Sequence, residues 1–223
     1  MSDLFSIFDT NTNSMFDLNW LSSILNLLTL PHSFWFFNSK LFYILNKINL
    51  ILYKELKSIL NHKFNILNSI FLITLFFFIF INNIMGLFPY IFTNSSHMIF
   101  SMSLSLPLWI SLMIFSFKNN FNFTFAHMIP QGTPNILMPF MVIIESISNV
   151  IRPMTLTIRL TANMIAGHLL VTLLSQSACN QLMFMSSMII LIQTILLILE
   201  FSVSIIQSYV FSILVTLYIK ETN

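Results

Sequence analysis

Long apolar runs, interrupted at a few points by polar residues, set the pattern of this chain. The clearest run, 66–88, contains the stretch FLITLFFFIFI, carries no charged residue and is followed by Pro89. A second run, 97–117, contains Pro107 and ends just before Lys118. Because about 20 apolar residues span the hydrocarbon core of a bilayer, 66–117 is predicted to form two upright transmembrane helices.

Two further apolar runs, 136–177 and 181–219, are much longer. At about 1.5 Å per residue, a helix of about 40 residues reaches about 60 Å, twice the roughly 30 Å hydrocarbon core. Each run is therefore either a pair of spans without a real loop or one strongly tilted helix. No turn signal interrupts 182–219, which favours tilt. The segment 136–219 is thus predicted to be a hairpin of two long, steeply tilted helices, and 119–134 before it a polar loop.

Residues 40–63 have a different pattern, with five of the nine basic residues of the chain. On a helix, the lysines at 40, 47 and 54 fall within about 60° of one another, together with Ser58 and Asn61, while Leu and Ile fill most of the opposite arc. This pattern predicts a helix that lies in the membrane interface with its lysines toward the headgroups, on the positive inner side. Packing against a partner subunit is the alternative.

The N-terminal segment, 1–39, gives a weaker signal. Residues 20–37 are apolar but short, and Pro31 and His32 interrupt them; they are interpreted as a first crossing. The opening residues are acidic and lack a basic region ahead of an apolar core. They are therefore predicted to be neither a secretory signal nor a transit peptide.

Composition supports the membrane class. The 223 residues are 57% hydrophobic and only 7% charged, whereas soluble domains are about 25% charged. The single cysteine excludes an internal disulfide framework and a cysteine-based metal site, and the net charge of +2 does not indicate a nucleic-acid partner. The fold class predicted is all-α integral membrane, as a single membrane domain, without a cofactor or a metal. Abundant Ile, Phe and Asn with scarce Gly are typical of an A+T-rich coding sequence, such as a mitochondrial genome.

Ionisable residues inside the two long runs are the strongest functional signal. There are five: Glu145, Arg152, Arg159, His168 and Glu200. A charged group in the middle of a bilayer costs about 2.5–3.5 kcal/mol on insertion scales. Such residues are expected where they face a bundle interior or a water-filled path.

Their spacing predicts two polar faces. The first comprises residues seven apart, joined by two asparagines: Glu145, Arg152 and Arg159, with Asn149 and Asn163. A step of seven residues drifts by only about 20° around a helix. The second lies on the last run: Gln193, Glu200, Ser204 and Gln207. His168 is about 180° from Arg159 around the helix and borders a different environment. Two polar seams on adjacent apolar helices indicate a proton pathway.

Each of these residues also has a structural interpretation. Arg152 could be a side chain that snorkels toward a nearby loop. Glu145 and Glu200 could form structural ion pairs with the arginines, and His168 could be a satisfied buried histidine. Arg159 lies too deep for easy snorkelling, and a functional role is favoured for it.

Two other protein classes compete with a proton-channel subunit. A proton-coupled secondary transporter would show inverted repeats and broken helices at equivalent positions of two halves, and neither is visible. A redox-chain membrane subunit would need several histidines at span-compatible spacing, and only His168 lies deep in a predicted span.

Several motifs, in this order, resemble one family. They are MGLFPYIFT (85–93), SLSLPLW (103–109), HMIPQGTP (127–134), MVIIESISNVIRPM (141–154), IRLTANMIAGHLL (158–170) and LEFSVSIIQSYVFSILVTLYI (199–219). The chain resembles subunit a of the F-type ATP synthase in its mitochondrial form, a stator subunit that is no enzyme on its own. The resemblance implies a multi-pass protein of the mitochondrial inner membrane that carries protons. Its implied partners are the rotor c-ring, the peripheral stalk, other membrane-sector subunits and the lipid bilayer.

The resemblance also assigns roles. It implies that Arg159 is the essential arginine that faces the rotor-ring carboxylates. It implies that His168 and Glu200 line the half-channel open to the proton-rich side, and that Glu145 belongs to the inner-side exit. Asn163 and Gln207 match the polar residues that flank the arginine.

Overall fold

The computed structural model describes residues 4–11, 17–31, 39–60, 66–119, 121–129, 134, 137–178 and 183–222. Within these ranges the chain forms helices, turns and short connections, without a strand. In chain order the helices are η1 (Leu4–Phe8), η2 (Leu18–Leu21), α1 (Ser22–Leu25), η3 (Asn26–Thr29), α2 (Lys40–Leu60), α3 (Ile66–Gly86), η5 (Asn94–Ser96), α4 (Met98–Asn119), α5 (Phe121–His127), α6 (Met138–Ala178) and α7 (Met183–Thr222). The predicted all-α class is confirmed.

Four of the helices are long and apolar enough to cross a membrane. They are α3, α4, α6 and α7, and their bounds lie within a few residues of the predicted runs. Pro107 stays inside α4 and Pro153 inside α6. The fold is that of an all-α integral membrane protein.

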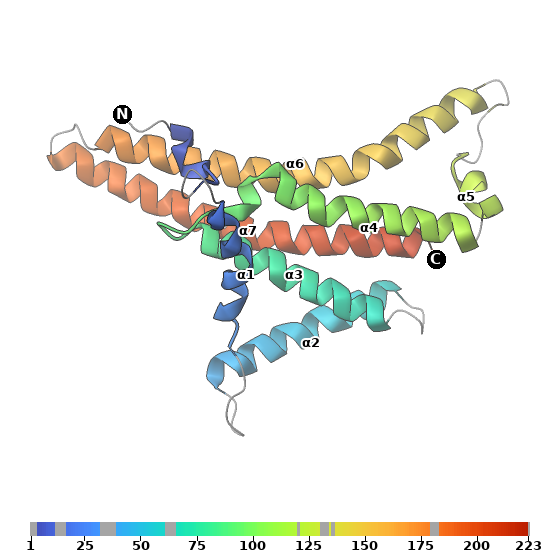
Figure 1. Cartoon of the computed structure of the whole chain (residues 1–223), viewed down its shortest axis with the longest axis horizontal. Coiled ribbons are helices and arrows are strands. Elements are labelled where there is room, and N and C mark those ends of the chain that lie inside the picture. Colours follow the sequence, from blue (N-terminus) through green and yellow to red (C-terminus); the bar gives the residue numbers. More distant parts are fainter. Residues whose placement is uncertain are drawn as a thin grey trace.

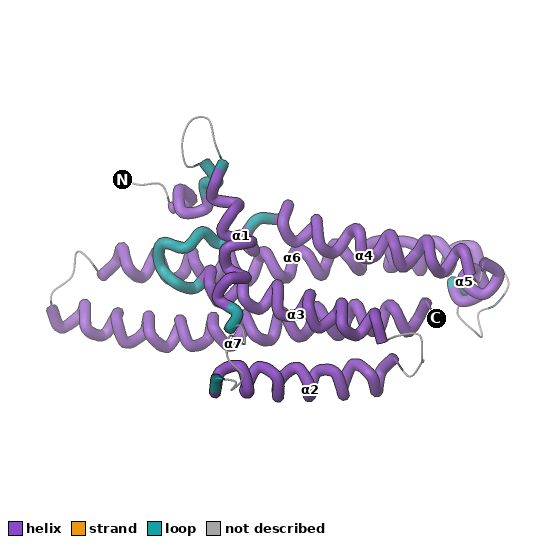
Figure 2. Tube along the Cα trace, turned by 60° about the horizontal axis from the view of Figure 1, so that its bottom comes forward, coloured by secondary structure: helices purple, strands orange, loops and turns teal. Residues whose placement is uncertain are grey.

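Helices α6 and α7 are each one continuous element, of 41 and 40 residues. They run antiparallel and side by side (Figures 1 and 2), and they extend well past the ends of α3 and α4. Figure 1 also shows that the two halves of α6 are not collinear, as expected of a helix with an internal proline. Of the two alternatives left by the length of these runs, the single long helix is correct.

The core lies where α2, α3, α6 and α7 meet. Its buried residues are Leu56, Leu60, Leu72, Leu75, Ile79, Leu156, Leu160, Phe211, Val215 and Ile219. Beside it, α7 buries a small hydroxyl residue at every fourth position: Ser204, Ser208, Ser212 and Thr216. Each hydroxyl donates to a carbonyl of its own helix three residues earlier. These side chains need no partner from other helices, and their small size allows close helix packing.

Helix α2 is amphipathic in the structure. It buries Leu52, Leu56 and Leu60 against α3 and α7, while its lysines and several other apolar residues remain exposed. Figure 1 shows α2 at the edge of the bundle, next to α3. The bundle covers only the leucine side of α2, and its contact with lipid or with another subunit stays a prediction.

One sequence prediction needs revision, and another stays a prediction. The predicted polar loop 119–134 contains a helix, α5, whose Phe121 and Phe125 rings pack on each other at 4.8 Å and on Phe117 of α4. These ring contacts, in which Phe121 and Phe125 remain largely exposed, were not included in the loop prediction. In the predicted first crossing, η2, α1 and η3 cover 18–29, and 32–38 lie outside the described residues.

Candidate functional site

Gly167 of α6 and Glu200 of α7 lie against each other where the two long helices pack. A Cβ atom built on Gly167 would lie 2.7 Å from Oε1 and 2.9 Å from Cδ of Glu200. These distances are shorter than real Cβ contacts, so a larger residue at this position would force the Glu200 carboxylate to move. The Glu200 side chain is thereby enclosed between the helices and is only 9% exposed.

A cavity of about 280 Å³ opens beside this contact. Its polar lining comes from two helices, with Asn163 and His168 on α6 and Glu200 on α7. The remaining lining residues are Leu87, Met164, Ala166, Gly167, Leu170, Leu196, Leu199 and Val203. The structure therefore brings three of the sequence-predicted site residues into one space with apolar walls. At about 30 Å³ per water molecule, that space is large enough for several waters.

Two polar atoms at this cavity have no hydrogen-bond partner among the described residues. They are Oε1 of Glu200 and Nε2 of His168, and both are buried. Buried polar atoms in proteins are almost always hydrogen-bonded, so these two atoms are expected to bind water or to exchange a proton. No ion pair between Glu200 and an arginine is found in the described part of the chain, and the structural interpretations of Glu200 and His168 lose support.

Arg159 lies on an exposed face of α6, away from this cavity. Its side chain makes no hydrogen bond or ion pair with any described residue. Its neighbours at one-turn spacing on the same exposed face are small: Thr155, Ala162 and Ala166. Ile158 beside it is 48% exposed. Arg159 is thus an exposed permanent charge on a largely apolar part of α6, two turns from Arg152 and one turn from Asn163.

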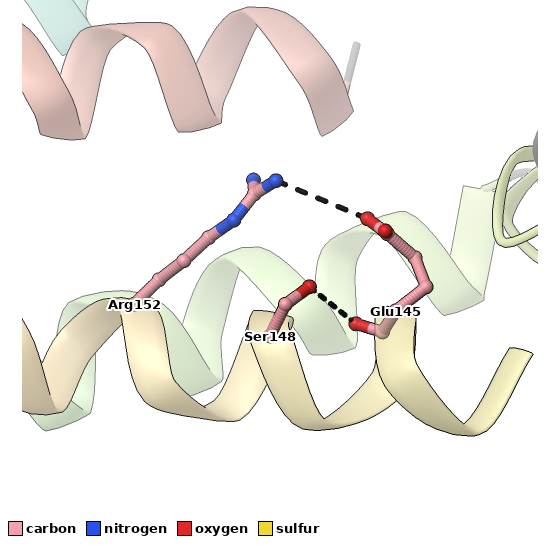
Figure 3. A network of polar contacts seen from close by, with 3 residues as sticks. All are labelled: Glu145, Ser148 and Arg152. Atoms are coloured by element: carbon pink, nitrogen blue, oxygen red, sulfur yellow. Dashed lines mark hydrogen bonds and ion pairs between the residues drawn. The ribbon is translucent and has the colours of Figure 1, made fainter. Parts of the chain in front are cut away.

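Near one end of the long helices, Glu145 and Arg152 form an ion pair. The distance from Arg152 Nη2 to Glu145 Oε1 is 4.0 Å, and the two side chains are 34% and 35% exposed. The Arg152 guanidinium also lies over the ring of Tyr218 on α7, 5.4 Å from its centroid. Figure 3 shows the pair, with the Ser148 hydroxyl donating to the Glu145 carbonyl at 2.8 Å. The structural interpretation of Glu145, as a partner of an arginine, is the arrangement observed.

The predicted polar faces are only partly realised. Glu145 and Arg152 are joined, but Arg159 of the same predicted face stands apart. On α7, Glu200 and Ser204 are buried, whereas Gln193 and Gln207 are half-buried. Gln207 is not among the residues that line the cavity at Glu200. Among the described residues, no cluster of three or more His, Cys, Asp or Glu could hold a metal ion.

Sequence reasoning missed a buried polar cluster where α3 leads into α4. The Asn26 amide donates to Oδ1 of Asn82 at 3.0 Å, and the Asn94 amide donates to the Ser22 hydroxyl at 2.7 Å. Asn83 is 0% exposed, and neither polar atom of its side chain has a partner among the described residues. Two adjacent asparagines near the end of the most apolar run were the available signal.

This cluster adjoins the cavity. A Cβ atom built on Gly86, at the end of α3, would lie 3.5 Å from Cε of Met164, and Met164 lines the cavity. His97 lies next to the cluster and packs on Phe92 at 5.1 Å and on Trp20 at 5.2 Å. Burial lowers the pKa of His97, while a hydrogen bond with the Phe8 backbone acts in the opposite direction.

Comparison with known proteins decides between the classes of function. The family model described as "ATP synthase A chain" matches residues 21–220. ATP synthase subunit a of Drosophila melanogaster is 49% identical over 223 residues, which cover 100% of both chains. Subunit a of Locusta migratoria is 50% identical over 222 residues, 99% of each chain. Subunit a of Anopheles gambiae is 50% identical over 227 residues, with 100% of both chains covered.

The chain belongs to the ATP synthase subunit a family. The resemblance drawn from its motifs is confirmed. As a member of the subunit a family it is a proton-translocating subunit of the membrane sector and one component of a complex, rather than the catalyst of that complex. Its four long apolar helices are those of a multi-pass membrane protein. The secondary transporter and the redox-chain subunit are excluded as family assignments.

Proposed function

We propose that this chain is the stator subunit that guides protons through two half-channels separated by Arg159, which faces the carboxylates of a rotor c-ring. The observation that carries the proposal is the position of Arg159. It is an exposed guanidinium without a partner in the described chain, on a largely apolar part of α6. On the same helix, a buried polar cavity lies on one side of it and an ion pair on the other.

The chemistry of arginine fits this role. A guanidinium keeps its proton at any accessible pH, so Arg159 is a permanent positive charge. A rotor carboxyl that approaches it is driven to release its proton, because a nearby opposite charge favours the ionised form. Once past Arg159 and facing lipid, a bare carboxylate is costly and must take up a proton again. Offset entry and exit paths on the two sides of Arg159 would turn this exchange into directed rotation.

The outer half-channel is proposed to run through the cavity at Glu200. His168 and Glu200 supply groups that can bind and release a proton, and Asn163 supplies a polar side chain. The adjoining cluster supports a hydrated entrance, because both amide atoms of Asn83 and Oδ1 of Asn94 are buried without a partner among the described residues.

The inner exit is proposed at Glu145, whose side chain is 35% exposed even with its ion pair to Arg152 formed. Gln207, half-buried on α7, is proposed to lie beside the arginine. Each proton that crosses between the two paths releases about 2.3 kcal/mol per 100 mV of membrane potential.

The face around Arg159 suits a rotor helix. Thr155, Ala162 and Ala166 are small and exposed, and small residues allow helix backbones to approach closely in membranes. A rotor carboxylate could therefore come near the guanidinium without a large side chain between them. The other partners proposed are the peripheral stalk, further membrane-sector subunits and, for the lysine face of α2, the lipid headgroups.

The mitochondrial inner membrane is the proposed location. The full-length insect relatives and a composition typical of A+T-rich organelle genomes support it. The lysines of α2 would then face the inner, matrix side.

The test is ATP-driven proton pumping by the assembled complex with Arg159→Ala. We expect pumping to be lost while ATP hydrolysis sites remain intact. Ile158→Ala, on the same exposed face, is the matched control and should pump normally. Normal pumping by Arg159→Ala would return this residue to a structural role and overturn the proposal.

A further inference from the structure

The N-terminal segment is fastened to the polar end of the bundle at several points. Asn19 donates to the Asp9 carbonyl at 3.1 Å, which ties η1 to η2. Asn94 donates to Ser22 of α1 at 2.7 Å, and Asn26 donates to Asn82 at 3.0 Å. The described parts of this segment, 4–11 and 17–31, therefore cover the connection between α3 and α4.

Within η1, Phe8 is the residue that turns toward the site. Its ring meets the His168 imidazole edge-on, with 6.5 Å between centroids and an angle of 82° between planes. Its backbone interacts with His97. Phe5 and Ile7 of the same helix are 65% and 47% exposed, whereas Phe8 is half-buried.

His168 needs such a contact if its orientation is to be fixed. Its Nε2 atom has no hydrogen-bond partner among the described residues, and the wall of the cavity around it is mostly apolar. Rotation of the imidazole is then limited by packing rather than by a polar anchor. An edge-on aromatic ring is a preferred and directional neighbour for another ring.

We propose that Phe8 is a positioning residue of the outer proton entrance, which holds the His168 imidazole in the orientation that it needs beside Glu200 and covers its outer face. Phe8 itself neither binds nor transfers a proton. The inference rests on the proposed function, because it gives His168 a role in proton uptake. The titratable groups nearest the pair are Glu200 on α7, His97 before α4 and Asp9, which follows Phe8 in the chain.

The experiment compares two phenylalanines of one helix in the assembled complex, reconstituted into lipid vesicles. ATP synthesis is driven by an imposed proton gradient, and its rate per assembled complex is measured while the pH on the outer side is varied. Phe8→Ala should lower the rate about tenfold, as is common when a reacting group is slightly misplaced, and should move the pH profile. Phe8→Tyr, which keeps the ring, should restore both, and Phe5→Ala should match the unmodified complex.

Other outcomes separate the inference from the proposed function. If Phe8→Ala changes only the amount of assembled complex, and neither the rate per complex nor the pH profile, the positioning role is overturned. The positioning role is also overturned if adding Phe8→Ala to His168→Gln lowers the rate by as much as Phe8→Ala does alone. The effects of two residues that act through one another are not additive. If Phe8→Ala behaves normally while Arg159→Ala abolishes pumping, the inference fails and the proposed function stands.

Discussion

On the two sides of Arg159, the long α6–α7 hairpin places its ionisable residues in opposite surroundings. On one side, Glu200, near the middle of α7, is buried in a cavity, and an oxygen of its carboxylate has no partner in the described chain. On the other side, Glu145 is about one-third exposed, pairs with Arg152, and shares that arginine with the Tyr218 ring. Glu200 is therefore left without a protein partner for one carboxylate oxygen, whereas Glu145 has Arg152 as its partner.

This difference bears on how each half-channel would be completed. Leaving a buried polar group without a partner costs free energy, so the cavity at Glu200 is a feature that the fold maintains against that cost. A half-exposed ion pair carries little cost and little gain. We infer that this chain builds the outer path largely by itself, whereas the inner path takes its shape from the rotor and from other subunits. Arg159 lies between the two.

The largest expected effect comes from changing the charge that separates the two sides. Arg159→Lys keeps a positive charge, but lysine can lose its proton in an apolar site and cannot offer a planar fork of donors. We expect complete loss of coupled pumping, measured in vesicles that hold the assembled complex. Full activity of the lysine variant would mean that any positive charge is sufficient and that the boundary needs no guanidinium.

The next largest effect tests whether the outer cavity depends on Gly167. Gly167→Ala would place a Cβ atom 2.7 Å from Glu200 Oε1. The carboxylate end of a flexible side chain can move away, so we expect the complex to assemble but the proton flux through it to fall by about tenfold or more. Flux is measured as the decay of an imposed pH gradient across vesicles with the catalytic sector removed.

A second glycine provides the control. In Gly86→Ala the nearest atoms are Thr93 Cγ2 at 3.3 Å and Met164 Cε at 3.5 Å. These contacts require only a small adjustment, and flux should stay within about twofold of normal. Equal flux in both alanine variants would show that the position of the Glu200 carboxylate does not limit proton entry.

The sequence alone was sufficient for the long helices, and it singled out the most prominent candidate site residues. Runs without charge identify transmembrane helices whatever the packing, and Arg159 and Glu200 stand out because charges are rare in such runs. The sequence alone could not predict how the side chains pack and pair. Periodicity placed Glu145, Arg152 and Arg159 on one face, but it could not show that the first two pair with each other and leave the third exposed.

The polar cluster on α3 shows a second limit. Asn82 and Asn83 lie in a run whose mean hydropathy is strongly apolar, so a search for transmembrane helices does not single them out. Whether these asparagines are buried and paired depends on residues far away in the sequence, such as Asn26, which bonds Asn82. The role of Gly167 could not be predicted either, because it depends on the Glu200 side chain that lies against the position where a Cβ atom would be.

A smaller effect is expected on the inner side. Arg152→Gln removes the partner of Glu145, but exposed ion pairs are worth only about 0–1 kcal/mol. We expect ATP-driven pumping to fall by no more than about fivefold, a factor that corresponds to about 1 kcal/mol. Glu200→Gln, on the outer side, should cost far more in the same assay. If the two variants lose equal activity, the contrast between the two sides does not extend to function.

The smallest effect concerns the aromatic contacts of His97, which lies just before α4 and outside the spans. Burial lowers the pKa of His97 from its usual 6.5, although its hydrogen bond with the Phe8 backbone opposes this. His97 therefore binds a proton less readily when the N-terminal segment packs on it than when that segment is detached. Packing of the N-terminal segment on His97 is fully favourable above pH 6.5 and weakens as the pH falls below that value.

Hydrogen exchange of residues 17–31 in the assembled complex, corrected for the intrinsic effect of pH, measures this packing directly. Protection should decrease modestly between pH 7.5 and 5.5, because protonation of His97 works against its contacts with Trp20 and Phe92. In His97→Gln, which cannot titrate, protection should be the same at both pH values. A decrease that persists in His97→Gln would assign the pH response to another group.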